Sequence, residues 1–212
     1  MTLRGGLYLL ADTTALPPER WPAIVPTVLD AGPVLVQFRA KTQPAATRRH
    51  LARQLLDWCT ARDIPLLIND DPSLCHTLGA AGVHLGAHDP AVATARRELG
   101  PTALIGVSCY GDPERAHRAA AAGADYLSFG RLFPSRTKPK ARALPAGFLP
   151  QIRAAVRLPL CAIGGIDPDN APAVLAAGAD LLCVAGGIWS APDPAAAAAR
   201  LVAHCRLHFS DP

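Results

Sequence analysis

The feature that most constrains the fold is a regular alternation of short, strand-like apolar runs with longer helical segments. Eight such runs occur, over residues 7–11, 34–38, 65–69, 82–86, 103–107, 126–130, 160–164 and 181–186. Of the Ala-rich segments between them, several open with Asp-Pro, an acidic N-cap followed by proline at the first helical position, and several end in glycine. Such β–α alternation predicts a parallel sheet.

An internal echo narrows the architecture. Ala-Gly pairs precede the second, fourth, sixth and eighth runs, and we expect each pair to end a helix, with glycines at positions 32, 82, 123 and 178. Eightfold β–α repetition predicts an α/β fold of the (β/α)8 TIM-barrel type, formed by a single domain over residues 1–212. The alternative, an open doubly wound sheet, usually shows a Gly-rich turn after its first strand, whereas "DTTALPPE" has no glycine.

Composition limits the classes of partner. The net charge of +4 comes from 21 Lys and Arg against 17 Asp and Glu, and the excess is spread along the chain. It forms no basic block with interleaved aromatic residues, so we expect small anionic ligands and no nucleic acid. The six cysteines show no metal-ligand spacing and are typical of buried thiols in a reducing compartment.

The sequence also predicts a location. The apolar run near the N-terminus is too short for a signal peptide, and no apolar stretch approaches the length of a membrane span. We therefore expect a cytoplasmic protein with no membrane partner. The sequence does not fix whether the chain forms a homo-oligomer.

The stretch "VQFRAK" places polar side chains at every second position of a strand. Because side chains alternate between the two faces of a strand, Gln37, Arg39 and Lys41 share one face, and the apolar residues Val36, Phe38 and Ala40 share the other. In a barrel the first face points to the interior and, at its upper end, to the mouth where active sites lie. The pattern predicts a ligand site at the mouth.

Other strand-like runs also end in polar or glycine residues, namely Asn69, Asp70 and Asp71, then Asp89, Ser108, the loop with Ser135, Thr137 and Lys138, and the pairs Gly164–Gly165 and Gly186–Gly187. Most of these residues have a simpler explanation when each is taken alone, although Asp70, one position before Asp71, is not a natural helix cap. Asp71 and Asp89 each precede proline and are typical of helix N-caps, glycine pairs are typical of turns, and basic loops are typical of surfaces.

The set as a whole indicates phosphate chemistry. Glycine pairs after the seventh and eighth strands of a barrel form phosphate sites from backbone N–H groups. Cations beside carboxylates indicate a second, more highly charged anion that is held partly through a divalent metal, for which Mg²⁺ is the usual ion. The residues therefore predict two phosphorylated small-molecule substrates, one of them a diphosphate whose departure is stabilised at the mouth.

Six segments in order along nearly the whole chain resemble the thiamine-phosphate synthase family, namely "VQFRAK", "LLINDD", "GVHLGAHD", "IGVSCY", "ADYLSFGRLFPSRTK" and "CAIGGI". The resemblance implies a barrel enzyme that joins hydroxymethylpyrimidine diphosphate to thiazole phosphate. It implies Mg²⁺ on Asp70 and Asp89, and the diphosphate on Arg39, Lys41, Ser108 and Lys138. It implies Gln37 and Asn69 beside the pyrimidine, Ser135 and Thr137 in contact with the substrates, and the amides near Gly165, Gly186 and Gly187 on the thiazole phosphate.

The resemblance also implies a dissociative reaction that needs little acid–base catalysis, and we assign no catalytic role to His84 or His88. Two departures from the family pattern are "GAHD" for the usual "GQED", which keeps only Asp89, and "VAGG" after the eighth strand, which removes a serine. Two alternatives stay open. One is an isomerase related to thiazole tautomerases, and the other is a non-catalytic protein that binds phosphorylated ligands.

Overall fold

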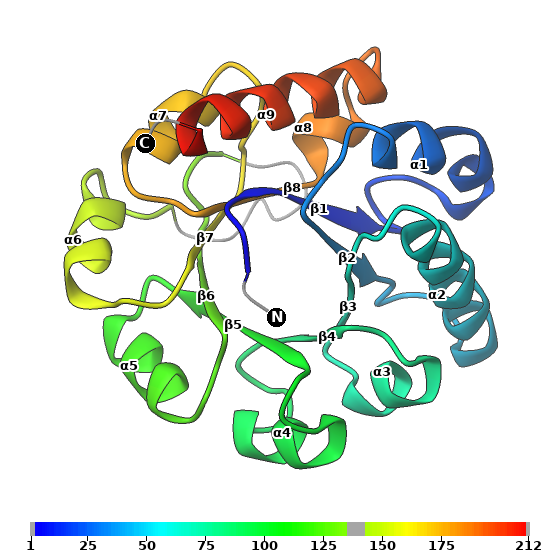
Figure 1. The fold of residues 1–212 in the computed structure, drawn as a ribbon, viewed down its shortest axis with the longest axis horizontal. Coiled ribbons are helices and arrows are strands. Elements are labelled where there is room, and N and C mark those ends of the chain that lie inside the picture. Colours follow the sequence, from blue (N-terminus) through cyan, green and yellow to red (C-terminus); the bar gives the residue numbers. More distant parts are fainter. Residues whose placement is uncertain (1–2, 135–142, 211–212) are drawn as a thin grey trace.

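The computed structural model describes residues 3–134 and 143–210, in which the eight strand-like runs form a closed parallel barrel ringed by helices (Figure 1). The strands are β1 (Gly6–Asp12), β2 (Leu35–Arg39), β3 (Leu66–Asn69), β4 (Gly82–Leu85), β5 (Leu104–Tyr110), β6 (Tyr126–Phe129), β7 (Leu160–Ile163) and β8 (Leu181–Val184). The helices are η1 (Pro18–Arg20), α1 (Trp21–Leu29), α2 (Ala45–Thr60), α3 (Pro72–Leu78), α4 (Val92–Leu99), α5 (Pro113–Ala121), α6 (Phe148–Ala155), α7 (Ala171–Ala176), α8 (Gly186–Trp189) and α9 (Pro194–Phe209).

The predicted barrel is confirmed by the strand pairing. Each strand lies parallel to its neighbours in sequence, and β1 also pairs with β8, with Gly6 opposite Leu181. This pairing closes the ring, so the open doubly wound sheet is excluded. The register shifts between Ser108 and Tyr110, where a bulge in β5 changes the direction of the strand near its end.

The alternation of side chains along the strands divides the core into two layers. The larger layer lies between strands and helices and includes Phe38, whose ring meets Trp21 of α1 edge to face at 6.1 Å. The smaller layer fills the barrel interior and includes Tyr8 and Tyr126, both fully buried. The interior is a packed core, as in other barrels, so ligands have access only at its ends.

The expected Asp-Pro helix starts are confirmed at three positions. The carboxylates of Asp71, Asp112 and Asp193 each accept a hydrogen bond from a backbone N–H of the first helical turn. At Asp167 the expectation was wrong, because α7 begins only at Ala171 and the Asp167 carboxylate instead accepts from the amides of Asp169 and Asn170.

The Ala-Gly echo has a structural cause at three of its four glycines. Gly32, Gly123 and Gly178 follow helices with φ between 82° and 99°, a left-handed conformation that glycine adopts without strain. Gly82 differs, because α3 already ends at Leu78 and Gly82 opens β4, where a side chain would collide with the backbone of Leu104. The prediction that this Ala-Gly pair ends a helix was therefore wrong.

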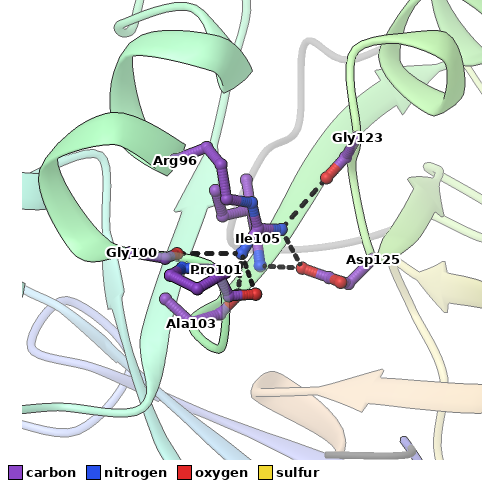
Figure 2. Close-up of polar contacts among 7 residues, drawn as sticks. All are labelled: Arg96, Gly100, Pro101, Ala103, Ile105, Gly123 and Asp125. Carbon is purple, nitrogen blue, oxygen red and sulfur yellow. Dashed lines mark hydrogen bonds and ion pairs between the residues drawn. The ribbon is translucent and has the colours of Figure 1, made fainter.

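An arginine joins three elements at the end of the barrel where the strands begin (Figure 2). Arg96 of α4 forms an ion pair with Asp125 at 2.7 Å and donates to the carbonyl groups of Ala103 and Gly123. The same Asp125 oxygen accepts from the backbone N–H of Ile105 at 2.7 Å. The cluster therefore ties α4 to the residues that begin β5 and precede β6, and it supports the sheet at the end away from the mouth.

The arrangement recurs two β–α units later. Arg153 of α6 pairs with Asp180 at 2.8 Å and donates to the carbonyl groups of Val156 and Leu158. Asp180 also accepts from the backbone N–H of Leu160 at 2.7 Å, as Asp125 accepts from Ile105. Both aspartates follow an Ala-Gly-Ala sequence of the internal repeat. Part of that repeat therefore reflects the same Arg–Asp pair, used twice to hold the residues at the start of a strand.

Among the described residues, no helix combines the length and the apolar character that crossing a membrane requires.

We predict that Asp125→Ala lowers the free energy of unfolding by about 1–3 kcal/mol, because it leaves the N–H of Ile105 without its acceptor. Urea unfolding measures the change. Asp30→Ala is the matched control, since the Asp30 side chain is 64% exposed and its ion pair with Arg62 is worth about 0–1 kcal/mol. Equal effects of the two substitutions would contradict the role given to Asp125.

Candidate active site

The polar side chains of β2 lie as the alternation predicts. Val36, Phe38 and Ala40 belong to the layer between strands and helices. On the other face, Gln37 is buried and its Nε2 donates to the Tyr8 hydroxyl inside the barrel at 2.6 Å. The strand therefore directs its polar side chains from the interior toward the mouth, and Arg39 is its last residue.

The partner of Arg39 was missed by sequence reasoning. Asp12 lies opposite Arg39 in the β1–β2 register, and their side chains form an ion pair. The Asp12 side chain is 1% exposed and also accepts from the backbone N–H and the hydroxyl of Thr14. A signal was present, because Asp12 is the last residue of the first strand and active-site residues gather at such ends. The ion pair with Asp12 holds the guanidinium of Arg39 in place.

Lys41 and Asp70 meet across the ends of β2 and β3. The Lys41 ammonium lies 3.0 Å from the Asp70 carboxylate, and both groups are accessible to solvent. Asp70 has φ +66°, which is uncommon for a residue other than glycine. Backbone strain of this kind is typical of functional sites.

Asp89 meets Asp70 at the same place. The two carboxyl groups lie beside each other, and each changes the pKa of the other. Burial raises the pKa of the Asp89 carboxyl, and the hydrogen bond with Asp70 raises it further. Burial also acts to raise the pKa of Asp70, but hydrogen bonds from Asp89 and Lys41 outweigh it and leave that pKa below its usual value.

The structure separates the two aspartates that precede proline. Asp71 is the N-cap of α3, accepts from the N–H of Leu74 at 2.9 Å and pairs with Arg48 at 3.1 Å, as its cap pattern predicts. Asp89 is not a cap, because Ala91 holds that position of α4. Instead the Asp89 carboxyl accepts from the N–H of Gly86 at 2.6 Å, which turns it toward Asp70.

A cavity of about 500 Å³ opens beside this group, with Lys41, Asp70 and Asp71 in its wall. Its other polar lining includes Arg48 and Asn69, and Asn69 helps to lower the pKa of Asp70. The cavity also reaches Phe38, Ala40 and Ile68 of the layer between strands and helices, so it borders the predicted site on the side of Lys41 and Asp70. Within the described residues, no group of three or more His, Cys, Asp or Glu side chains is arranged to hold a metal ion.

Ser108 lies near the end of β5 and is half-buried. Its hydroxyl lies 2.9 Å from Nε2 of His84, and its carbonyl accepts from Nε of Arg115 at 2.7 Å. His84 was expected to be a strand residue without a catalytic role, and it is indeed in β4. Its contact with Ser108 was not expected, because the two residues are far apart in sequence.

Two further residues were missed. Arg115 of α5 donates to the carbonyl groups of Ser108 and Gly86 and so bridges the ends of β4 and β5. Tyr110 has φ +57°, is 47% exposed, and accepts a hydrogen bond from the N–H of Ala87 at 3.3 Å. Together they hold the loop that carries Asp89 against β5.

The glycine pairs after β7 and β8 lie together. A side chain at Gly187 would collide with the carbonyl of Ile166, and one at Gly165 would collide with Phe133 and Pro134. Gly186 and Gly187, expected to follow the last strand, open the short helix α8, which sequence reasoning did not predict. Backbone N–H groups of such loops and of a short extra helix are the usual phosphate ligands of barrels.

Three predicted site residues, Ser135, Thr137 and Lys138, lie outside the described residues.

The comparison with protein families gives a match over most of the chain. The sequence profile described as "Thiamine monophosphate synthase" matches residues 7–188. This chain belongs to the thiamine monophosphate synthase family.

Individual relatives agree with this assignment. The chain is 48% identical over 193 residues to the thiamine-phosphate synthase of Azoarcus sp. (strain BH72), covering 89% of this chain and 91% of that one. It is 45% identical over 204 residues to the thiamine-phosphate synthase of Nitrosococcus oceani, covering 96% and 92%. The thiamine phosphate pyrophosphorylase of Pyrococcus furiosus superposes with a TM-score of 0.86 at 30% identity, over 98% of both chains. The protein is thus an enzyme of the transferase class that acts in thiamine biosynthesis.

We predict that Asp12→Asn lowers the free energy of unfolding by about 2–3 kcal/mol, because Arg39 would keep its charge and lose its buried partner. The loss stays below that of a fully buried pair because the Arg39 side chain is 15% exposed. Urea unfolding measures it, with Asp169→Asn as the control, since Asp169 is 83% exposed beside Arg200. An unchanged stability of Asp12→Asn would show that the pair does not hold Arg39.

Proposed function

We propose that this protein joins 4-amino-2-methyl-5-hydroxymethylpyrimidine diphosphate to 4-methyl-5-(2-phosphoethyl)thiazole, giving thiamine phosphate and diphosphate, or to the carboxylated form of that thiazole, giving CO2 as well. The observation that carries the proposal is the convergence of Arg39, Lys41, Asp70, Asp89 and Ser108 on one mouth of the barrel. Family membership supplies the reaction, and this group of residues has the charges that a diphosphate substrate requires.

The diphosphate is proposed to bind at the cationic side of the mouth. Arg39 is a preorganised donor, because Asp12 fixes its position before any ligand arrives. Lys41 is the more mobile cation, since its side chain is 53% exposed and exchanges Asp70 for a phosphate oxygen at little cost. Ser108 adds a hydroxyl donor, and Lys138, on the basis of the family resemblance, adds a third cation.

The pyrimidine is proposed to lie beside Gln37 and Asn69, below the diphosphate. Gln37 is buried at the top of the packed interior, and Asn69 ends β3 beside Asp70. Their amides offer both donors and acceptors to a heterocycle. Ser135 and Thr137 contact the substrates in this proposal, again from the resemblance alone.

Mg²⁺ is the proposed cofactor, and the donor set fits it. Asp70 and Asp89 present hard oxygen donors beside each other, and a divalent cation relieves the repulsion between two neighbouring carboxylates. Two carboxylates plus substrate phosphate oxygens are a usual way to hold Mg²⁺. When bound, the ion supplies positive charge that stabilises a departing diphosphate.

In the proposed reaction, the bond between the pyrimidine methylene carbon and the diphosphate oxygen breaks first, and its electron pair leaves with the diphosphate. The thiazole nitrogen then donates its lone pair to the methylene cation and forms the new C–N bond. Neither step moves a proton to or from the substrates. The protein's contribution is therefore charge stabilisation by Arg39, Lys41 and Ser108 together with positioning of the two substrates.

The thiazole phosphate is proposed to bind at the amides near Gly165, Gly186 and Gly187. Close packing of these glycines against neighbouring backbone gives the loops fixed positions without side chains over the amides. A phosphate held there lies across the ring from the proposed metal ligands Asp70 and Asp89, because β7 and β8 stand opposite β3 and β4, which these residues follow (Figure 1).

The two alternatives differ from this proposal in what they require. An isomerase related to thiazole tautomerases needs no site for a diphosphate with a metal, and a non-catalytic binding protein needs no group that stabilises a leaving group. The family relatives named as synthases and the paired carboxylates beside Lys41 favour the synthase.

We predict that the purified protein forms thiamine phosphate from the two substrates and that removal of Mg²⁺ with a chelator stops the reaction. Chromatography of the product with and without added metal measures this. Formation of product at the same rate without any divalent metal would contradict the role of Mg²⁺. No product under any condition would contradict the function itself.

We predict that Asp70→Asn lowers the rate of diphosphate release by about a hundredfold or more, because a neutral amide binds Mg²⁺ poorly. Asn tolerates the left-handed backbone at this position, so the fold is not strained. Asp71→Asn is the matched control, because Asn also caps helices well and the rate should stay close to that of the unsubstituted protein. Equal losses from both substitutions would show that the metal ligands are assigned wrongly.

A further inference from the structure

Five polar side chains form a continuous hydrogen-bonded chain through the interior of the barrel. Gln37 Nε2 donates to the Tyr8 hydroxyl at 2.6 Å, and the hydroxyl groups of Tyr8 and Tyr126 lie 2.8 Å apart. The Tyr126 hydroxyl lies 2.8 Å from Nδ1 of His84, and Nε2 of His84 lies 2.9 Å from the Ser108 hydroxyl. The chain links five strands and ends at a residue of the mouth.

The rings in this chain are held firmly by packing. Tyr8 and Tyr126 meet edge to face with their centroids 5.8 Å apart, and His84 stacks on Tyr126 at 5.7 Å. Gly106 makes room for the Tyr126 ring, since any side chain there would overlap its hydroxyl end. All four side chains other than Ser108 are buried. The order of the hydrogen bonds is therefore fixed by the fold.

Counting protons gives this chain a direction. The amide nitrogen of Gln37 can only donate, so the Tyr8 oxygen accepts from it. Among the described contacts the Tyr126 oxygen is the acceptor within reach of the buried Tyr8 proton, so we assign Tyr8 as the donor to Tyr126. Tyr126 in turn has one proton, which it donates to Nδ1 of His84. Burial raises the pKa of both phenols well above the usual value, so each phenol keeps the proton that this count requires.

We propose that this chain is a one-way relay of hydrogen bonds, in which each group donates to the next and no proton is transferred. It holds His84 with its proton on Nε2, so that Nε2 donates to the Ser108 oxygen and the Ser108 hydroxyl donates a hydrogen bond into the mouth. His84, Tyr126 and Tyr8 are positioning residues in this account. The acceptor of the hydrogen bond from the Ser108 hydroxyl is an oxygen atom of a phosphate or diphosphate. That this acceptor is the leaving diphosphate, and not another phosphate, rests on the function proposed above.

The direction of the relay matters for the chemistry. A serine hydroxyl has one proton, and if that proton went to His84, only oxygen lone pairs would face the anion and would repel it. With the proton of His84 on Nε2, the serine accepts from the histidine and becomes a donor to the anion. Arg115 donates to the backbone carbonyl of Ser108 and holds the backbone there. His84 contacts the Ser108 hydroxyl and therefore sets the direction of its hydrogen bond.

The tautomer of His84 is the direct test. In protein labelled with ¹⁵N at histidine, two-bond ¹⁵N–¹H correlations distinguish the protonated from the unprotonated ring nitrogen, and His84→Gln identifies its signals among the 7 histidines. We expect the proton on Nε2, and we expect this preference to weaken in Tyr126→Phe, which removes the donor to Nδ1. A proton on Nδ1 in the unsubstituted protein would overturn the relay.

Turnover tests whether His84 acts through Ser108. His84→Leu should lower kcat about 10–100-fold, as is usual for residues that orient a ligand-binding group. His84→Gln should retain more activity, because its amide nitrogen restores a donor to Ser108. In the background of Ser108→Ala, His84→Leu should cause little further loss. Full additivity of the two losses would contradict an action through Ser108.

Two controls separate this inference from other effects. His50→Gln, at an exposed histidine of α2, should leave kcat unchanged, and urea unfolding should show that the His84 variants remain folded. If the unsubstituted protein forms no thiamine phosphate, the proposed function fails, and the tautomer of His84 alone then decides for or against the relay.

Discussion

Closure of eight parallel strands into a ring is the constraint on which the rest of the structure depends. It makes every second side chain of a strand point inward, and it brings the ends of distant strands to one mouth. The interior is too narrow to stay empty, so it is filled by apolar side chains and by the Tyr8–Tyr126 pair. The buried phenols need partners, and the partners that they have are the residues that lead to Ser108.

The charges at the mouth are largely arranged before any ligand binds. Arg39 is held by a buried aspartate, Asp70 is held near Lys41 by an unusual backbone conformation, and Asp89 is held by a backbone N–H group. Such preorganisation is costly for stability, because like charges and buried polar groups are kept close together. It favours binding of a highly charged substrate, which then meets donors that need little rearrangement. The ion pairs at the opposite end, around Arg96 and Arg153, support the ring.

Much of this arrangement was predictable from the sequence, because its causes are local. The alternation of strands and helices gave all eight strands, and the period of two along β2 placed Gln37 and Arg39 on the inner face. The residues that the sequence did not predict depend on contacts between distant parts of the chain. Asp12 matters only because the register sets it opposite Arg39, and His84 matters only because β5 and β6 bring Ser108 and Tyr126 to its two nitrogens. Asp71 and Asp89 share one sequence pattern, and only the fold makes the first a cap and the second a partner of Asp70.

The most direct test of this account is a crystal structure of the protein grown with inorganic diphosphate and Mn²⁺ in place of Mg²⁺, in which anomalous scattering locates the metal. The account predicts one metal ion bound by Asp70 and Asp89, with the diphosphate in contact with Arg39, Lys41 and the Ser108 hydroxyl. A metal ion bound elsewhere, or a diphosphate that contacts neither Arg39 nor Lys41, would contradict the central claim that this mouth is built to bind and release diphosphate.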